Sequence, residues 1–213
     1  YNLIYNNQAI NRYKNNTFKI SGNKAKNLEK LKNLITNIKN CELKKSATNI
    51  VFSDGNPDAK IMLIGEGPGA NEDQEGLPFV GRAGTLLDKM LDSIYLNRKN
   101  VYITNVVNYR PPENRKPTEE EIARYLPYLK KHIEIIGPKI LVLLGSTAMN
   151  AIVGNKVVIS KARGQWLEKQ FGNCKPHIII TFHPAFLMRQ PAQKKSAWID
   201  LKMIKEKKSK LRI

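Results

Sequence analysis

The sequence predicts an α/β fold in which a central, mainly parallel sheet of four strands lies between two layers of helices, a three-layer αβα arrangement. Two observations support this class. Short continuous apolar runs, typical of strands buried on both faces, alternate along the chain with helical patterns of apolar residues. In addition, 213 residues with 41% hydrophobic content are enough to bury such a core in one domain.

The chain divides into a short arm and one domain. Residues 1–24 are polar and rich in Asn, so we expect a loosely ordered N-terminal arm there. A single α/β domain is expected over residues 25–213. It begins with an amphipathic helix at 25–39, because the Leu and Ile residues of that segment recur at steps of three and four.

The strands are expected where apolar residues run without interruption, as they do from Ile61 to Ile64. These runs lie at residues 60–65, 101–107, 139–145 and 177–182.

Further helices are expected between and after the strands. Thr118 and Glu121 form a potential capping box behind Pro117, which indicates where the longest helix begins. The later helices are expected at residues 84–94, 118–136, 146–152 and about 192–208, the last of which is basic and rich in Lys.

The chain is strongly basic, with 36 Lys and Arg against 18 Asp and Glu and a net charge of +18. An excess of this size attracts polyanions, so nucleic acid is the first partner class to consider. The alternative is a biased composition whose lysines are merely solvated. No apolar run reaches the roughly 20 residues that cross a bilayer, and the polar N-terminus lacks the apolar segment of a signal peptide. We therefore expect no membrane association and a cytoplasmic location.

The cysteines and histidines do not suggest a metal site. Cys41 and Cys174 are far apart and lack CxxC spacing, which argues against a zinc site or a disulfide framework. The histidines His132, His177 and His183 also lack the spacing of paired metal ligands.

Ligands of an open parallel sheet bind beyond the carboxyl ends of the strands. This rule selects three loops, at residues 65–84, 105–115 and 183–191. In the first loop, Gly65 and Gly67 allow the backbone to approach a ligand closely. We expect the chemistry to lie where these loops meet.

The same loops carry motifs of a known family. The segment GEGPGANEDQEGLPFVGRAG begins at Gly65, and YITNVVNYRPPENRKP begins at Tyr102. The segments KARGQW and HPAFLMRQP begin at Lys161 and His183. In order and spacing, residues 41–191 resemble the family 4 uracil-DNA glycosylases. The resemblance implies a DNA repair enzyme that flips uracil out of single- or double-stranded DNA and hydrolyses its N-glycosidic bond, leaving an abasic site.

Base removal needs a stacking surface, a reader of the base edge and a group that stabilises the leaving base. Phe79 is placed to stack on uracil beside Gly65 and Gly67. Asn105 can accept from uracil N3–H and donate to O4, whereas cytosine presents the reverse pattern. His183 matches the position from which the family donates a hydrogen bond to uracil O2. Taken singly, each of these residues also has a purely structural explanation.

The attacking water needs an orienting group. Related glycosylases often place Asp or Asn at the third position of the first motif, which here is Gly67 and has no side chain. This leaves Glu66 to position the water, with Glu72 and Asp73 as alternatives. An oxocarbenium-like centre needs little activation of its nucleophile, so an orienting carboxylate suffices.

Contacts to DNA are expected from the third loop and its neighbours. Leu187 or Met188 could enter the duplex as an apolar wedge, with core packing as the alternative. Arg163, Arg189 and Lys194 are candidates for phosphate contacts.

The sequence departs from the family at the ligands of its 4Fe–4S cluster. Of four cysteine positions only Cys41 remains, and Ile38, Tyr109 and Tyr125 occupy the others. One thiolate cannot hold a cluster that needs four ligands. We therefore expect no cluster and no metal, with these side chains filling the space.

Two rival functions remain to be separated. A dinucleotide-binding module is a weak alternative, because Gly69 and Ala70 do not complete GxGxxG and nearby acids would repel phosphate. The other is an inactive DNA-binding protein that kept the glycosylase fold. We expect an active, monomeric enzyme associated with the nucleoid.

Overall fold

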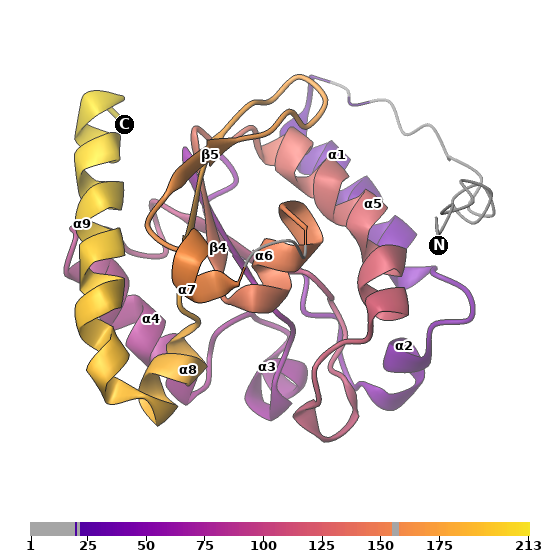
Figure 1. Cartoon of the computed structure of the whole chain (residues 1–213). Helices are drawn as coiled ribbons and strands as arrows, with labels where there is room; N and C mark the ends of the chain where they lie inside the picture. Colours follow the sequence, from indigo (N-terminus) through magenta and orange to yellow (C-terminus); the bar gives the residue numbers. More distant parts are fainter. Residues whose placement is uncertain (1–19, 21, 155–157) are drawn as a thin grey trace, which may run out of the picture.

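The computed structural model describes residues 20, 22–154 and 158–213. Most of the arm expected over residues 1–24 lies outside these described residues. The described part is built around one sheet with helices on both faces (Figure 1). The three-layer αβα class predicted from the sequence is confirmed.

Within the described residues, the sheet has six strands in the order β1-β3-β2-β4-β6-β5. The four expected strands form its inner part and are mutually parallel. The expected count of four is wrong, because β1 and β5 pair antiparallel at the two edges. These edge strands are short and only partly buried, so no apolar run marks them. The strands are β1 (Asp54–Gly55), β2 (Ile61–Gly65), β3 (Tyr102–Asn105), β4 (Ile140–Leu144), β5 (Trp166–Glu168) and β6 (His177–Thr181).

The long helices lie close to their expected positions. They are α1 (Lys24–Thr36), α4 (Arg82–Asp92), α5 (Glu119–Ile136), α6 (Ser146–Ile152) and α9 (Lys194–Lys210). The capping box before α5 is confirmed, since Glu121 N–H donates to Thr118 Oγ1 at 3.2 Å and Thr118 N–H donates to Glu121 Oε2 at 2.8 Å.

Several short helices were not expected, because four to six residues are too few to show a helical period. They are α2 (Glu42–Ser46), α3 (Ala70–Glu75), α7 (Ile159–Ala162) and α8 (Pro184–Arg189). Two of them, α3 and α8, lie inside the loops that we expected to carry the chemistry. Short 3₁₀ turns cover Pro112–Asn114 and Pro191–Gln193.

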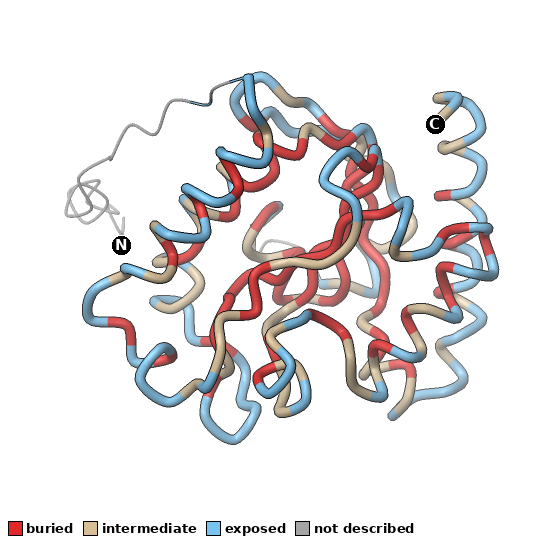
Figure 2. The backbone as a smooth tube through the Cα atoms, turned by 180° about the vertical axis from the view of Figure 1, so that it is seen from behind, coloured by how far each residue is buried: buried red, intermediate tan, exposed pale blue. Residues whose placement is uncertain are grey.

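Alternate residues of each strand face opposite helical layers. Met62 and Ile64 of β2 pack with α1, α5 and α6, whereas Ile61 and Leu63 pack with α4, α8 and α9. Figure 1 shows α1 and α5 on one side of the sheet and α4 and α9 on the other. The inner strands are buried, as the red segments in the middle of Figure 2 show.

The strand order creates a switch point between β2 and β4. From β2 the chain passes to β3 on one side, and it later returns to β4 on the other side. A crevice opens at the carboxyl ends of two strands whose connections diverge in this way, and ligands of α/β sheets bind there. The fold therefore directs attention to the residues that follow β2, β3, β4 and β6. Among the described residues, no helix combines the length and the apolarity needed to span a membrane.

Candidate active site

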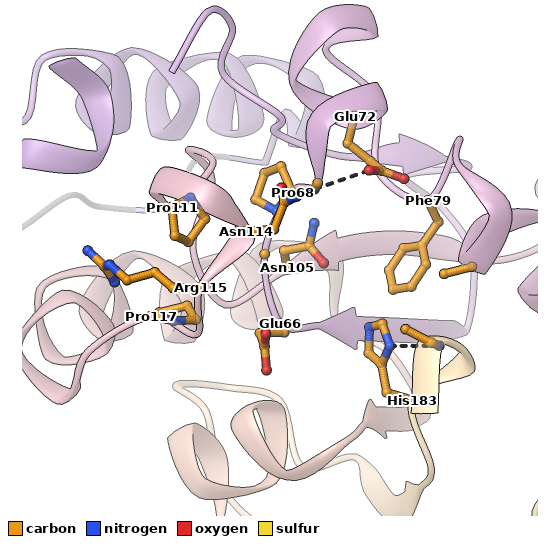
Figure 3. Close-up of a pocket in the computed structure, with 14 residues that line it drawn as sticks. Glu66, Pro68, Glu72, Phe79, Asn105, Pro111, Asn114, Arg115, Pro117 and His183 are labelled. Carbon is orange, nitrogen blue, oxygen red and sulfur yellow. Dashed lines mark hydrogen bonds between the residues drawn. The ribbon is translucent and has the colours of Figure 1, made fainter. Parts of the chain in front are cut away.

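A cavity of about 190 Å³ opens at this edge of the sheet (Figure 3). All three expected loops line it: Glu66 and Phe79 come from the first, Asn105 and Pro111 from the second, and His183 from the third. The structure thus brings together residues that are more than a hundred positions apart in the sequence.

Asn105 ends β3 and lies beside Gly65 at the end of β2, since the two residues are partners in the parallel register. Its side chain is buried, and its Oδ1 is the one buried side-chain polar atom of the described residues that lacks a hydrogen-bond partner. A side chain at position 65 would overlap this oxygen. The glycine therefore keeps space in front of a buried acceptor that can take a hydrogen bond from a ligand.

Phe79 forms the opposite wall, with its ring directed into the cavity (Figure 3). Its backbone has a φ of 56°, the left-handed region that bulky residues rarely adopt. The ring centroid lies 5.5 Å from that of His183, and a Cβ at Gly65 would lie 2.5 Å from Phe79 Cζ. A flat group can therefore lie against Phe79 only because residue 65 has no side chain.

His183 follows β6 and caps the first turn of α8. Its Nδ1 accepts a hydrogen bond from Ala185 N–H at 3.2 Å. In the neutral imidazole this assigns the proton to Nε2, which can donate to a ligand. Burial and the positive charge of Arg189 lower the pKa of His183 to about 4. The residue is therefore an uncharged hydrogen-bond donor at neutral pH.

Glu66 directly follows β2 and lines the cavity. Thr147 Oγ1 donates a hydrogen bond to Glu66 Oε2. Thr147 belongs to the first turn of α6, directly after β4, so this bond joins the two strands that flank the switch point. It fixes Oε2 of the carboxylate at the cavity.

The two alternative carboxylates have structural partners. Glu72 accepts from Gly69 N–H at 3.1 Å and from Gly81 N–H at 2.8 Å, so it ties together the two halves of the first loop. Asp73 is buried outside the cavity and accepts from the backbone of Thr48 and Asn49. Glu72 lines the cavity with both carboxylate oxygens bonded to backbone N–H groups, and Asp73 does not line it.

Two of the expected DNA contacts lie elsewhere. Leu187 is 1% exposed and packs in the core with α4 and α9, which agrees with the core-packing alternative rather than the wedge. Arg163 pairs with buried Asp200 and donates to Ser196 O, so its guanidinium is occupied within the fold. Met188 is half-buried and Arg189 and Lys194 are exposed. These three remain compatible with DNA contacts.

Sequence reasoning missed two parts of the site. Thr147 could have been found by applying the switch-point rule to the segment after β4, which was not among the three chosen loops. The second part is an outer wall of the cavity formed by Asn114, Arg115 and Pro117, at the end of the second expected loop, where no individual residue was given a role. Arg115 makes a two-fold contact with Glu121, at 2.8 and 2.7 Å. The two residues are six positions apart, with Arg115 directly after the 3₁₀ turn and Glu121 in the first turn of α5. No local sequence pattern predicts their contact.

The positions that match the family's cluster ligands do come together. Cys41, Tyr109 and Tyr125 belong to one buried cluster with Ile38 packed against it, and Cys41 Sγ lies 3.3 Å from Tyr125 Oη. Burial raises the pKa of both tyrosines, so their hydroxyls stay neutral and are poor ligands. Within the described part of the chain, no group of three or more His, Cys, Asp or Glu residues could hold a metal ion. These residues do not fit a cluster.

Comparison with known proteins shows the family of the chain. The family model described as "Uracil DNA glycosylase superfamily" matches residues 52–202, a span that includes every cavity residue named above. A Type-4 uracil-DNA glycosylase of Thermotoga maritima is 47% identical over 150 residues, covering 70% of this chain and 77% of that protein. That of Sulfurisphaera tokodaii is 43% identical over 184 residues, covering 84% of each chain. That of Archaeoglobus fulgidus is 40% identical over 176 residues, covering 81% of this chain and 88% of that protein. The chain therefore belongs to the uracil-DNA glycosylase superfamily.

Proposed function

We propose that this protein is a uracil-DNA glycosylase, a DNA repair hydrolase that cleaves the N-glycosidic bond of uracil in DNA and leaves an abasic site. The names of its relatives support this activity. The observation that carries it is the buried Oδ1 of Asn105, which faces a cavity without a hydrogen-bond partner. A flipped uracil would supply the missing donor through N3–H.

Selectivity follows from the same amide. Asn105 accepts through Oδ1 from uracil N3–H, and its Nδ2 can donate to O4. Cytosine offers an acceptor at N3 and a donor at its exocyclic nitrogen, so both contacts would be mismatched. A buried site that leaves polar groups unpaired rejects the wrong ligand strongly. Phe79 stacks on the base, and the absence of a side chain at Gly65 and Gly67 keeps room for it.

Bond cleavage places negative charge on the departing uracil. His183 Nε2–H is directed to stabilise that charge at O2, and the imidazole does so without a charge of its own because its pKa is about 4. Positive charge develops on the sugar, and Glu66 holds the attacking water beside it. Thr147 keeps the carboxylate of Glu66 in place.

DNA is held mainly through its phosphates. The net charge of +18 gives the protein a general attraction for the backbone of single- or double-stranded DNA. We assign phosphate contacts to Arg189 and Lys194, and we assign to Met188 the apolar contact with the distorted stack. The protein acts as a monomer without a membrane partner, in the cytoplasm and in association with the nucleoid.

We further propose that the enzyme works without an iron–sulfur cluster or another metal. The buried side chains of Cys41, Tyr109 and Tyr125 fill the corner that corresponds to the cluster ligands implied by the motif resemblance. Purified protein should contain no stoichiometric iron and show no visible absorbance band. Stoichiometric iron would refute this part of the proposal.

A release assay on matched oligonucleotides tests the activity. Uracil, thymine or cytosine is placed at one position in a single strand and opposite guanine in a duplex. We expect release from the uracil substrates only. Binding without release would instead favour the inactive DNA-binding protein. Binding that does not weaken with added salt would contradict the role assigned to the basic surface.

A further inference from the structure

The strained backbone of Phe79 is held from outside the cavity by a single arginine. Arg98 lies in the turn between α4 and β3. Its Nη2 donates to Phe79 O at 2.5 Å, and its Nη1 donates to Pro78 O at 3.0 Å. One guanidinium thus binds two successive carbonyls of the loop that presents the stacking ring.

Arg98 is itself fixed by two carboxylates. Its Nη1 lies 2.6 Å from Asp54 Oδ2 of the edge strand β1, and its Nε lies 2.9 Å from Asp88 Oδ1 of α4. The arginine side chain is 25% exposed, so its donors meet carbonyls and carboxylates largely out of water. The planar, forked guanidinium can satisfy these partners at once, whereas a lysine ammonium cannot.

The carbonyl of Phe79 is also confined on its other side. A Cβ at Gly84, in the first turn of α4, would overlap Phe79 O. Arg98 and the bare Cα of Gly84 therefore leave this peptide group little freedom to rotate. The φ of Phe79, 56°, is set by the peptide group that joins it to Pro78. Arg98 also holds the carbonyl of that group, so both peptide groups that flank the Cα of Phe79 are fixed.

We propose that Arg98 is a positioning residue for catalysis, which acts by holding Phe79 in the conformation that stacks on the flipped base. The inference rests on the proposed function of the cavity. Arg98 does not line the cavity and touches the reaction only through Phe79. The edge strand β1 takes part as well, because Asp54 orients the arginine.

A double-mutant cycle tests this role. In the full chain, Arg98→Lys should lower the single-turnover rate of uracil release by about ten- to a hundredfold, since small displacements in an active site have effects of that size. In the Phe79→Ala background, the same change should have almost no further effect, because the residue that it positions is gone.

Arg124 provides a matched control. Its Nη1 donates to Lys39 O at 3.0 Å and to Asn40 O at 2.6 Å, and Asn40 also has a positive φ, of 52°. This arrangement repeats that of Arg98 away from the cavity. Arg124→Lys should therefore leave the rate unchanged. Two results would overturn the proposal. One is an Arg98→Lys protein that releases uracil at the normal rate. The other is an Arg98→Lys change that slows the Phe79→Ala enzyme by the same factor as it slows the wild-type enzyme.

A second variant and an NMR measurement test the positioning role even if Arg98→Lys does not fold or has no activity. If Arg98→Lys does not fold, Asp88→Asn removes one of its two anchors and enters the same cycle, with a smaller loss expected and the same overturning results. The ring resonances of Phe79 in NMR spectra, identified by their loss in Phe79→Leu, should shift in Arg98→Lys but not in Arg124→Lys. Unshifted resonances would overturn the positioning role even in a protein without activity. Absence of release by the wild type would refute the proposed function alone.

Discussion

Two buried polar side chains at the carboxyl edge of the sheet have opposite surroundings. Asp200 of α9 is 0% exposed and fully bonded: Arg163 donates to both of its oxygens, at 2.5 and 3.0 Å, and Thr181 Oγ1 donates at 2.7 Å. Asn105 is 3% exposed, and its Oδ1 has no hydrogen-bond partner in the described structure.

This difference in hydrogen bonding suggests that Asp200 serves the stability of the fold and Asn105 serves the proposed reaction. Burial raises the pKa of Asp200, and the bonds from Thr181 and Arg163 oppose that rise. The triad ties α9 to β6 and to the segment before β5, so it stabilises the fold. The unpaired acceptor of Asn105 costs stability in the free protein, and under the proposed function it gains a partner when a base enters. Changes in the first region should alter unfolding, and changes in the second should alter the reaction.

The largest effect is expected at Arg163. Arg163→Met leaves Asp200 buried without its counter-charge, which should lower the free energy of unfolding by about 3 to 5 kcal/mol. Urea titration measures this loss, and uracil release well below the unfolding temperature should be unchanged. The double variant Arg163→Met with Asp200→Leu should recover most of the stability, because both charges are removed together. Stability that stays normal while DNA affinity falls would instead restore Arg163 as a phosphate contact.

The next largest effect belongs to the cavity. His183→Ala should slow uracil release on the order of a hundredfold or more, because the donor to the leaving base is lost. DNA binding and the free energy of unfolding should change little. Single-turnover release measures the rate, and a DNA-binding titration measures the affinity for DNA. An undiminished rate would remove His183 from its role.

The pH profile provides an independent control for His183. Its pKa of about 4 lies below the ordinary value of 6.5, so the neutral form persists as the pH falls until the solution approaches that lower value. The release rate should therefore stay level through the neutral range and fall only towards pH 4, as protonation breaks the bond from Ala185 N–H. A fall centred on the ordinary histidine pKa would show that the imidazole is not desolvated as the structure indicates.

A smaller effect is expected at Thr147. Thr147→Val keeps the shape of the side chain but removes the donor to Glu66, so release should slow by about tenfold. Thr147→Ser should retain most of the rate. In the Glu66→Gln background the valine change should add little, because the carboxylate that it orients is gone. A full additional loss there would assign Thr147 a role of its own.

The sequence predicted most of the framework and the centre of the site. Apolar runs identified β2, β3, β4 and β6, because strands buried on both faces must be apolar throughout. The rule for parallel sheets then placed Glu66, Asn105 and His183 at one edge. These predictions depend on local composition and on simple topology, both of which are present in a single sequence.

The remaining features depend on contacts between distant segments. Arg163 looked like a surface cation because its partner, Asp200, is 37 positions away. The role of Arg98 depends on carbonyls 19 and 20 positions before it. The sequence does not distinguish the two roles considered for Leu187, because a DNA wedge and a core residue are both apolar. Only the packing of α8 between α4 and α9 decides between them.

The smallest expected effect is a change in the free energy of unfolding, and its sign distinguishes the unpaired Asn105 from buried polar residues that are fully bonded. Asn105→Leu replaces a buried acceptor without a partner by an apolar side chain of similar shape, which should raise the free energy of unfolding by about 1 kcal/mol while release is lost. The neighbouring Thr104 donates to Phe52 O at 2.7 Å, so Thr104→Val should lower the same quantity by a similar amount. Urea titrations of both variants make the comparison. Two adjacent buried polar residues would then shift stability in opposite directions. If Asn105→Leu instead destabilises the protein, its Oδ1 is already satisfied in solution, and the acceptor is not held in reserve for a base.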